Sequence, residues 1–354
     1  MMSKLRMSIP AFGKLISLGL CMWKQCAGHG LGVGWLSALG SGPYPTRSRR
    51  IMIRSSVFMD WRSRGTTMRS PVLAFAAALI LLIAAPPASL RADPIPPGPA
   101  QQDVELGTIV LPVYTYRPAN CSEPSVLLVF HGVSRNADGY RDHARSLGDR
   151  LCMVVVAPQF DAKRFPSWRY QRGGIVRDHI VQDPHEWTGQ VVVSLIKWVR
   201  KEERISVPIF MIGHSAGAQF LSRLAAFVST DARRIVIANP STYVLPSLHV
   251  AAPFGFGGVY RNGDEEPLRR YLATPVTIFL GDNDVGDQER NDSPDAVAQG
   301  RTRLERGLNT FKAGQTLAQS RSWTFNWRLV EVPGVGHSAT KMFSSPQAVD
   351  ALAP

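Results

Sequence analysis

Seven short hydrophobic runs recur along residues 105–354 and alternate with longer segments of helical periodicity. Most of them are continuous runs of Val, Ile and Leu and do not alternate strictly with polar residues. That pattern is typical of strands buried on both faces of a parallel sheet. The predicted strands are 108–114, 125–130, 152–157, 208–212, 234–238, 275–280 and 327–332.

Helical segments lie between these runs, with hydrophobic residues three or four positions apart. In segment 216–228, Phe220, Leu224 and Phe227 would share one buried face. Repeated β–α alternation predicts an α/β fold with right-handed crossovers. The length of 105–354 suits one such domain. The predicted helices are 137–150, which Asn136 opens, 186–203, 216–228 and 295–318.

The strongly basic composition is confined to the amino-terminal part of the chain. The net charge is +13, but residues 1–92 hold twelve Lys or Arg residues and one acid, so the remainder carries only +2. A nearly neutral globular part argues against a nucleic-acid partner.

The segment 68–92 has the layout of a secretory signal peptide. A short basic start precedes 14 uncharged apolar residues (72–85), two prolines, and a possible cleavage site at 90–92. The run is shorter than the ~20 residues that span a bilayer, although an uncleaved anchor is an alternative. We therefore expect a secreted or periplasmic protein that meets the membrane only through its export signal.

Two further segments flank the predicted signal peptide. Because a signal peptide should begin at its own methionine, residues 1–67 are either a start-site artefact or a disordered extension. Residues 93–104 are Pro-rich and are expected to be a flexible lead-in to a domain at 105–354. Within that domain, Cys121 and Cys152 are either a disulfide, which an export compartment would permit, or two buried thiols.

A G-x-S-x-G motif is the centre of the predicted chemistry. The sequence GHSAG runs from Gly213 to Gly217, directly between a predicted strand and a predicted helix. In that setting a sharp turn exposes the serine hydroxyl, and the glycines are needed because side chains there would collide with neighbouring backbone. Ser215 is therefore the candidate nucleophile; a glycine-rich helix start with a capping serine is the structural alternative.

A serine hydroxyl needs a base within hydrogen-bond reach and a group that orients that base. His337 follows the last predicted strand in a Gly/Pro-rich loop, where such a base is expected. Asp284 follows the penultimate strand as the candidate acid, with Asp282 as the runner-up. The chain order Ser, Asp, His is the order used on α/β-hydrolase sheets.

Acyl transfer also needs donors for a developing oxyanion. The backbone N–H of Ala216 is one candidate. The other is the N–H of Val133, after a strand that ends in His131-Gly132.

With these motifs in order, residues 105–345 resemble the α/β-hydrolase superfamily. They are most similar to exported esterases of the polyhydroxybutyrate-depolymerase and feruloyl-esterase kind. The resemblance implies a mostly parallel eight-stranded sheet with helices on both faces, one strand more than the runs identify. It also implies an acyl-enzyme mechanism without a cofactor.

The expected function is hydrolysis of carboxylic esters on small-molecule or oligomeric substrates. A peptidase or amidase of the same fold and an inactive binding protein are the alternatives. No metal is expected, since the acidic run 282–292 lacks the glycine and glutamate of an EF-hand, and the oligomeric state is not predicted. Candidate substrate-binding residues are His131, Gly132, Trp168, His214 and Tyr243.

Overall fold

A computed structural model describes residues 95–204, 206–261 and 263–354. The extension predicted at 1–67, the signal peptide predicted at 68–92 and the first two residues of the lead-in lie outside the described residues.

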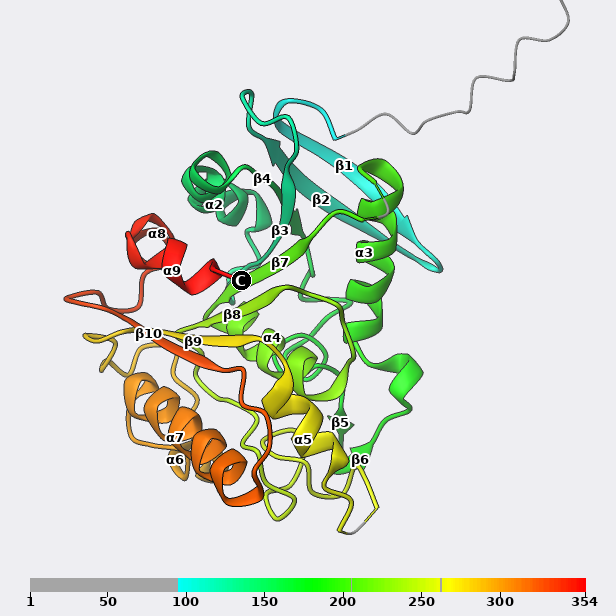
Figure 1. The fold of residues 1–354 in the computed structure, drawn as a ribbon. Coiled ribbons are helices and arrows are strands. Elements are labelled where there is room, and N and C mark those ends of the chain that lie inside the picture. Colours follow the sequence, from blue (N-terminus) through cyan, green and yellow to red (C-terminus); the bar gives the residue numbers. More distant parts are fainter. Residues whose placement is uncertain (1–94, 205, 262) are drawn as a thin grey trace, which may run out of the picture. The chain divides into compact units, whose positions relative to one another are not determined.

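A single eight-stranded sheet forms the centre of the described domain (Figure 1). The strand order is β1-β2-β4-β3-β7-β8-β9-β10. The pairs β1·β2 and β2·β4 are antiparallel, and every pair from β4 to β10 is parallel. The strands are β1 (Gly98–Leu106), β2 (Ile109–Arg117), β3 (Ser125–Phe130), β4 (Met153–Pro158), β7 (Ile209–His214), β8 (Arg234–Ala238), β9 (Val276–Gly281) and β10 (Arg328–Val332).

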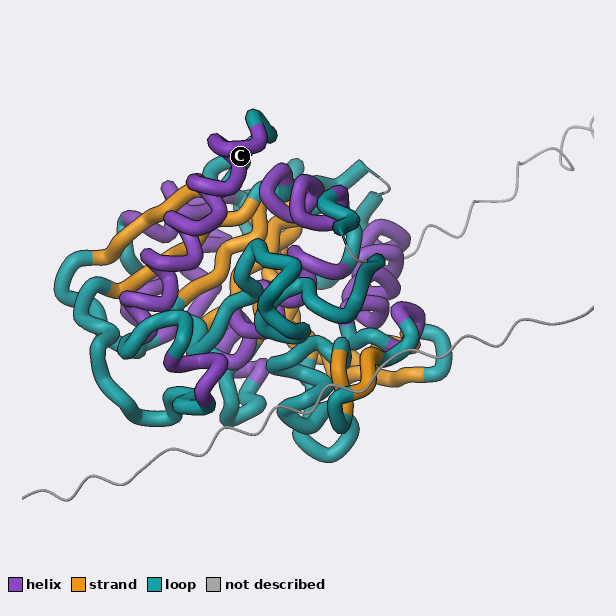
Figure 2. The backbone as a smooth tube through the Cα atoms, turned by 90° about the horizontal axis from the view of Figure 1, so that it is seen from below, coloured by secondary structure: helices purple, strands orange, loops and turns teal. Residues whose placement is uncertain are grey.

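Helices cover both faces of this sheet, which confirms the predicted fold class (Figure 2). Alternate residues of β3 point to opposite sides. Leu127 and Val129 pack with α2, α8 and α9, whereas Val126, Leu128 and Phe130 belong to the core under α3, α4, α5 and α7. The helices are α2 (Ala137–Leu151), α3 (Gly189–Glu202), α4 (Ala216–Phe227), α5 (Glu266–Ala273), α6 (Pro294–Val297), α7 (Arg303–Arg321), α8 (Ala339–Ser344) and α9 (Gln347–Leu352).

The flexible lead-in predicted at 93–104 is wrong from Gly98 onward, because β1 occupies most of it. This strand is the one that the hydrophobic runs do not reveal. Only Val104 and Leu106 of β1 are buried, so it has no continuous apolar run. An edge strand also tolerates Pro99. The turn at Gly107 (φ +70°) then returns the chain into β2.

Two predicted helices have different limits in the structure. In place of one helix at 186–203, the structure has a short 3₁₀ turn (Pro184–Glu186) and then α3, which begins at Gly189. The segment 295–318 is divided into α6 and α7 around Gly300, whose φ of +150° a helix cannot contain. A small hairpin, β5 (Val176–Arg177) with β6 (Ile180–Val181), lies outside the main sheet.

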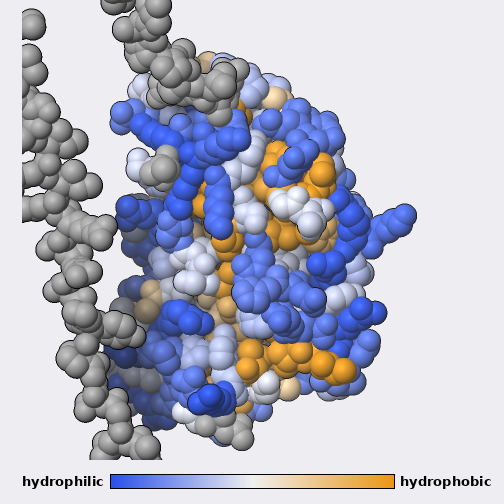
Figure 3. All heavy atoms as spheres, turned by 90° about the vertical axis from the view of Figure 1, so that its right-hand side faces the viewer, coloured by the Kyte–Doolittle hydropathy of each residue, from blue (hydrophilic) through white to orange (hydrophobic). Residues whose placement is uncertain are grey.

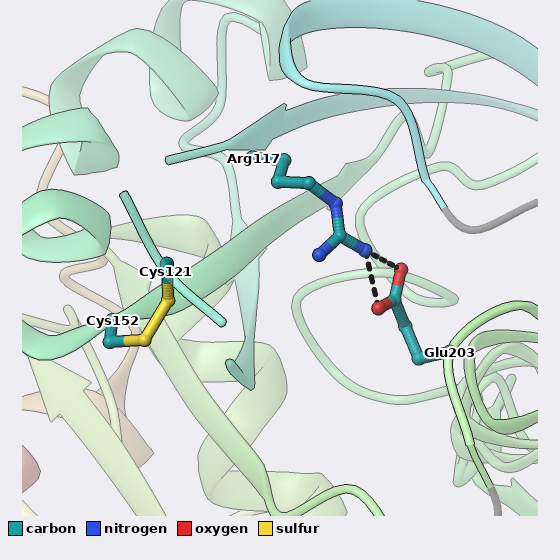
Figure 4. The surroundings of a disulfide bond; sticks show 4 residues. All are labelled: Arg117, Cys121, Cys152 and Glu203. Atoms are coloured by element: carbon teal, nitrogen blue, oxygen red, sulfur yellow. Dashed lines mark hydrogen bonds and ion pairs between the residues drawn. A yellow bond between two sulfur atoms is a disulfide. The ribbon is translucent and has the colours of Figure 1, made fainter. Parts of the chain in front are cut away.

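The alternative left open for the two cysteines is resolved, because Cys121 and Cys152 form a disulfide (Figure 4). It joins the loop after β2 to the end of α2 across 31 residues. In the chain-entropy model a loop of this size stabilises the fold by roughly 3–4 kcal/mol. Nearby, Arg117 at the end of β2 forms an ion pair with Glu203 next to α3.

The face that carries β1 and α3 is mainly hydrophilic, with small separate apolar patches (Figure 3). No helix among the described residues is long and apolar enough to cross a membrane.

Candidate active site

Ser215 lies in a sharp turn between β7 and α4, as the motif predicts. Its backbone has φ +57° and ψ −116°, a conformation that residues other than glycine rarely adopt. The Ser215 N–H donates to the Ala238 carbonyl, 3.0 Å away, on the neighbouring strand. A Cβ at Gly217 would lie 2.2 Å from the Phe130 carbonyl oxygen, and one at Gly213 would lie 2.6 Å from Gly217. The close packing of the turn therefore requires both glycines.

The structure brings the three predicted polar side chains together at the carboxyl ends of neighbouring strands. The Nε2 atom of His337, in the loop after β10, lies 3.0 Å from the Ser215 hydroxyl oxygen. Its Nδ1 atom lies 2.7 Å from a carboxylate oxygen of Asp284, which follows β9. The runner-up Asp282 instead accepts a hydrogen bond from the Gly334 N–H. This geometry selects Asp284 over Asp282 as the partner of the imidazole.

A buried arginine that the sequence analysis did not single out supports Asp284. The side chains of Arg303 and Asp284 are each 1% exposed, and their N and O atoms approach to 3.4 Å. Burial lowers the pKa of Arg303 below its ordinary value, and the adjacent Asp284 opposes that change. Arg303 also donates to the carbonyls of Gly286 and Gln288, so it holds the backbone of the loop that carries the carboxylate.

A second residue that sequence reasoning missed is Asn239, at the end of β8. It is fully buried and has φ +49°. Its side-chain oxygen accepts from the Gly281 N–H (2.9 Å), and its side-chain nitrogen donates to the Gly336 carbonyl (3.4 Å). Gly281 precedes the acid and Gly336 precedes His337, so one amide joins the two loops. Asparagine after a strand is common in turns, and no pattern in the sequence marks this one.

One predicted oxyanion donor, Ala216, follows Ser215 in the chain, and the other, Val133, shares a cavity with it. Ala216 is the first residue of α4, and the first N–H groups of a helix have no acceptor within it. Val133 lies in the loop after β3 and lines the same cavity as Ser215. Gly132 lines that cavity too, and a Cβ there would lie 2.6 Å from the Tyr140 hydroxyl. A larger residue at this position would therefore displace the Tyr140 side chain.

A cavity of about 220 Å³ opens above Ser215 and His337. It is mainly polar, and several of its walls come from residues that the sequence analysis did not name. His214 lines the cavity, with its ring centroid 4.6 Å from that of His337. Burial, together with the nearby His337, lowers the pKa of His214 well below its ordinary value. The cavity is lined by Gly132, Val133, Ser134, Asn136, Tyr140, His143, His214, Ser215, Glu289, His337, Ala339 and Thr340.

Three of the predicted substrate-binding residues do not line this cavity. His131 and Tyr243 are fully buried in the core. Trp168 lines a separate hollow of about 430 Å³ beside Trp187, which shares no lining residue with the cavity. A residue that follows a strand lies near the edge of the sheet that carries Ser215. The direction of its side chain, however, depends on tertiary packing.

The buried His131 has a structural role instead. Its Nε2 accepts from the Phe160 N–H at 3.0 Å, and its Nδ1 donates to the Gly132 carbonyl at 3.0 Å. Both bonds fit the neutral imidazole. Burial lowers the pKa of His131 from 6.5 to about 4.

This shift predicts an acid-sensitive fold. Above pH 6.5 both states leave His131 neutral, whereas between pH 6.5 and 4 the unfolded chain binds a proton there that the native state does not. The unfolding free energy should therefore fall by roughly 3 kcal/mol across this range from His131 alone. NMR titration of the His131 imidazole in the folded protein measures this directly. Protonation near pH 6.5 would contradict the prediction.

Within the described part of the chain, no group of three or more His, Cys, Asp or Glu side chains is arranged to hold a metal ion.

No protein-family model matches the chain, and no curated protein matches it. Solved structures do match. LpqC, a poly(3-hydroxybutyrate) depolymerase from Bordetella parapertussis, is 30% identical with a TM-score of 0.67, and the match covers 73% of this chain and 92% of that one. Poly(aspartic acid) hydrolase-1 from Sphingomonas sp. KT-1 has the same identity and TM-score, with 73% and 99% covered.

Proposed function

The chain belongs to the α/β-hydrolase superfamily, among members similar to a poly(3-hydroxybutyrate) depolymerase, and on that premise we propose that it is a serine hydrolase of carboxylic esters. The observation that carries the proposal is the continuous contact from the Ser215 hydroxyl through His337 to Asp284. Hydrolysis in general is common to the similar proteins. We assign the catalytic roles in this chain to Ser215, His337 and Asp284.

In the proposed mechanism His337 Nε2 takes the proton of Ser215 as the hydroxyl oxygen attacks the ester carbonyl carbon. Asp284 accepts the Nδ1–H bond, holds the required tautomer and stabilises the imidazolium that forms. The imidazolium then protonates the departing alcohol, which leaves an acyl group on Ser215. Water, deprotonated by His337, then attacks the acyl carbon. As the acyl–oxygen bond breaks, His337 returns this proton to the Ser215 oxygen, which releases the acid and restores the free serine.

The negative oxygen of each tetrahedral intermediate would accept hydrogen bonds from the N–H groups of Ala216 and Val133. Loss of one such donor typically raises the barrier by about 2.7–4 kcal/mol. The turn at Ser215 supports this assignment. Because α4 begins at Ala216, directly after the attacking residue, the Ala216 N–H has no acceptor within the helix.

Amide hydrolysis is a second candidate, because one similar protein is described as a hydrolase of poly(aspartic acid). Both reactions pass through the same acyl transfer, and they differ in the leaving group. We favour esters because an ester carbonyl is more electrophilic than an amide carbonyl, and because an alkoxide is a better leaving group than an amide anion.

The proposal predicts that the purified protein hydrolyses 4-nitrophenyl acetate or butyrate faster than aminoacyl 4-nitroanilides. It also predicts that a fluorophosphonate probe labels Ser215, which peptide mass spectrometry can locate. Faster cleavage of the anilides would favour the amidase. No turnover of any ester and no labelling of the folded protein would favour a binding protein.

We also propose that the protein is exported. The composition of residues 68–92 supports this, as does the Cys121–Cys152 disulfide, since such bonds persist in oxidising compartments. Fractionation of the producing cells tests the proposal: we expect the protein outside the cytoplasm with an amino terminus near residue 93, and recovery from the cytoplasm alone would contradict it.

A further inference from the structure

One wall of the cavity above Ser215 comes from the loop between β9 and α6, and it carries Glu289. The backbone of this loop is held in place. The Ser241 hydroxyl donates to the Glu289 carbonyl at 3.4 Å, and the buried Arg303 donates to the carbonyl of Gln288. Glu289 itself has φ +52°. These contacts keep the residue beside the cavity, while its side chain is exposed.

The carboxylate of Glu289 has no ion-pair partner among the residues that the structure describes. The neighbouring Arg290 pairs with Asp292 at 2.8 Å, and Arg303 is buried against Asp284. The side chains that line the cavity include neither lysine nor arginine. Within the described part of the chain, the cavity lining therefore carries a carboxylate without an ion-pair partner; the charge of opposite sign that acts on it, Arg303, is itself paired with Asp284.

The other titratable groups in the cavity do not supply a permanent positive charge. His214 is neutral because burial lowers its pKa, and burial raises the pKa of Tyr140, so that its hydroxyl stays neutral. His337 is neutral when it acts as a base. His143, whose Nδ1 lies 3.2 Å from the Thr340 hydroxyl, is the remaining imidazole.

The mechanism indicates which part of the substrate meets this wall. The departing oxygen must reach His337 Nε2 to be protonated, so the alcohol portion lies on the His337 side of Ser215. The loop that carries Asp284, the partner of His337, also carries Glu289.

We propose that Glu289 makes the site selective for esters of cationic alcohols, such as amino alcohols and quaternary ammonium alcohols, over esters of anionic alcohols. This inference rests on the proposed ester hydrolysis. A unit charge about 6 Å from the carboxylate, in a partly aqueous cavity, changes the rate by roughly 3–10-fold. Exchanging a cation for an anion on the substrate therefore changes the rate by about 10–100-fold, because the two effects multiply. Added salt should weaken the effect, because the carboxylate is exposed.

Three acetate esters of similar size test the proposal: acetylcholine, its uncharged analogue 3,3-dimethylbutyl acetate, and 4-acetoxybutyrate. Release of acetic acid by the exported form of the protein is followed in a pH-stat. We expect kcat/KM to decrease in that order, by roughly 10–100-fold in total. In Glu289→Gln the ratio of the first ester to the last should fall to within about threefold of one.

Asp287→Asn is the matched control, since it removes a carboxylate from the same loop at a residue that does not line the cavity. It should keep most of the wild-type ratio. Hydrolysis of all three esters at similar rates, or an unchanged ratio in Glu289→Gln, would overturn the assignment of Glu289 and leave ester hydrolysis intact. Failure to hydrolyse even the uncharged ester and 4-nitrophenyl acetate would overturn the proposed function and this inference with it.

Discussion

Replacing Ser215 by alanine is expected to lower kcat for 4-nitrophenyl acetate by roughly 10⁴- to 10⁶-fold. The hydroxyl is the atom that would form the acyl bond, and without it His337 can only activate water from an unsuitable position. KM should change little, because the methyl group leaves the cavity and the oxyanion donors in place. Steady-state rates and the loss of the initial burst of 4-nitrophenol measure the effect.

The fold should survive this change. Alanine tolerates the Ser215 turn no worse than serine, because both carry a single Cβ at φ +57°. Ser320→Ala, on the exposed side of α7, is the matched control and should retain full activity. A folded Ser215→Ala protein with more than a few per cent of wild-type kcat would show that another residue performs the attack.

Asp284→Asn is expected to lower kcat by on the order of 10⁴-fold. An amide in place of the carboxylate can donate to the imidazole and so favours the wrong tautomer, and it no longer stabilises the imidazolium. The change also leaves the buried Arg303 without its counter-charge, so the unfolding free energy should fall. Activity is therefore compared at a temperature at which circular dichroism shows both proteins to be folded.

The neighbouring Asp282 supplies a sharp comparison. It accepts a bond from the Gly334 N–H and does not contact the imidazole, so Asp282→Asn should change kcat by less than about tenfold. If Asp282→Asn were the more damaging of the two variants, the assignment of the acid would be wrong.

Much of the fold could be predicted because its strands are buried on both sides. Such strands leave continuous apolar runs, as in β3 and β4, and the glycines of the turn at Ser215 leave a motif. The edge strand β1 leaves no such pattern, because most of its side chains are exposed to solvent. The order of the parallel strands then explains why Ser215, Asp284 and His337 could be found from their positions alone.

The residues around this centre were harder to predict, because their roles depend on contacts between distant segments. Arg303 matters only because α7 brings it behind Asp284, and Asn239 only because the loops after β9 and β10 meet beside it. Two residues were wrongly expected to line the site for the same reason. His131 and Tyr243 follow strands at the expected edge of the sheet, but their side chains turn into the core.

The amide of Asn239 has a consequence for motion in the site. Because the buried residue also bonds through its own N–H to the Phe279 carbonyl, it ties the loops after β9 and β10 to the edge of the sheet. The backbone on either side of the imidazole–carboxylate pair is thereby fixed before substrate arrives, so little of the binding energy has to be spent on assembling the base.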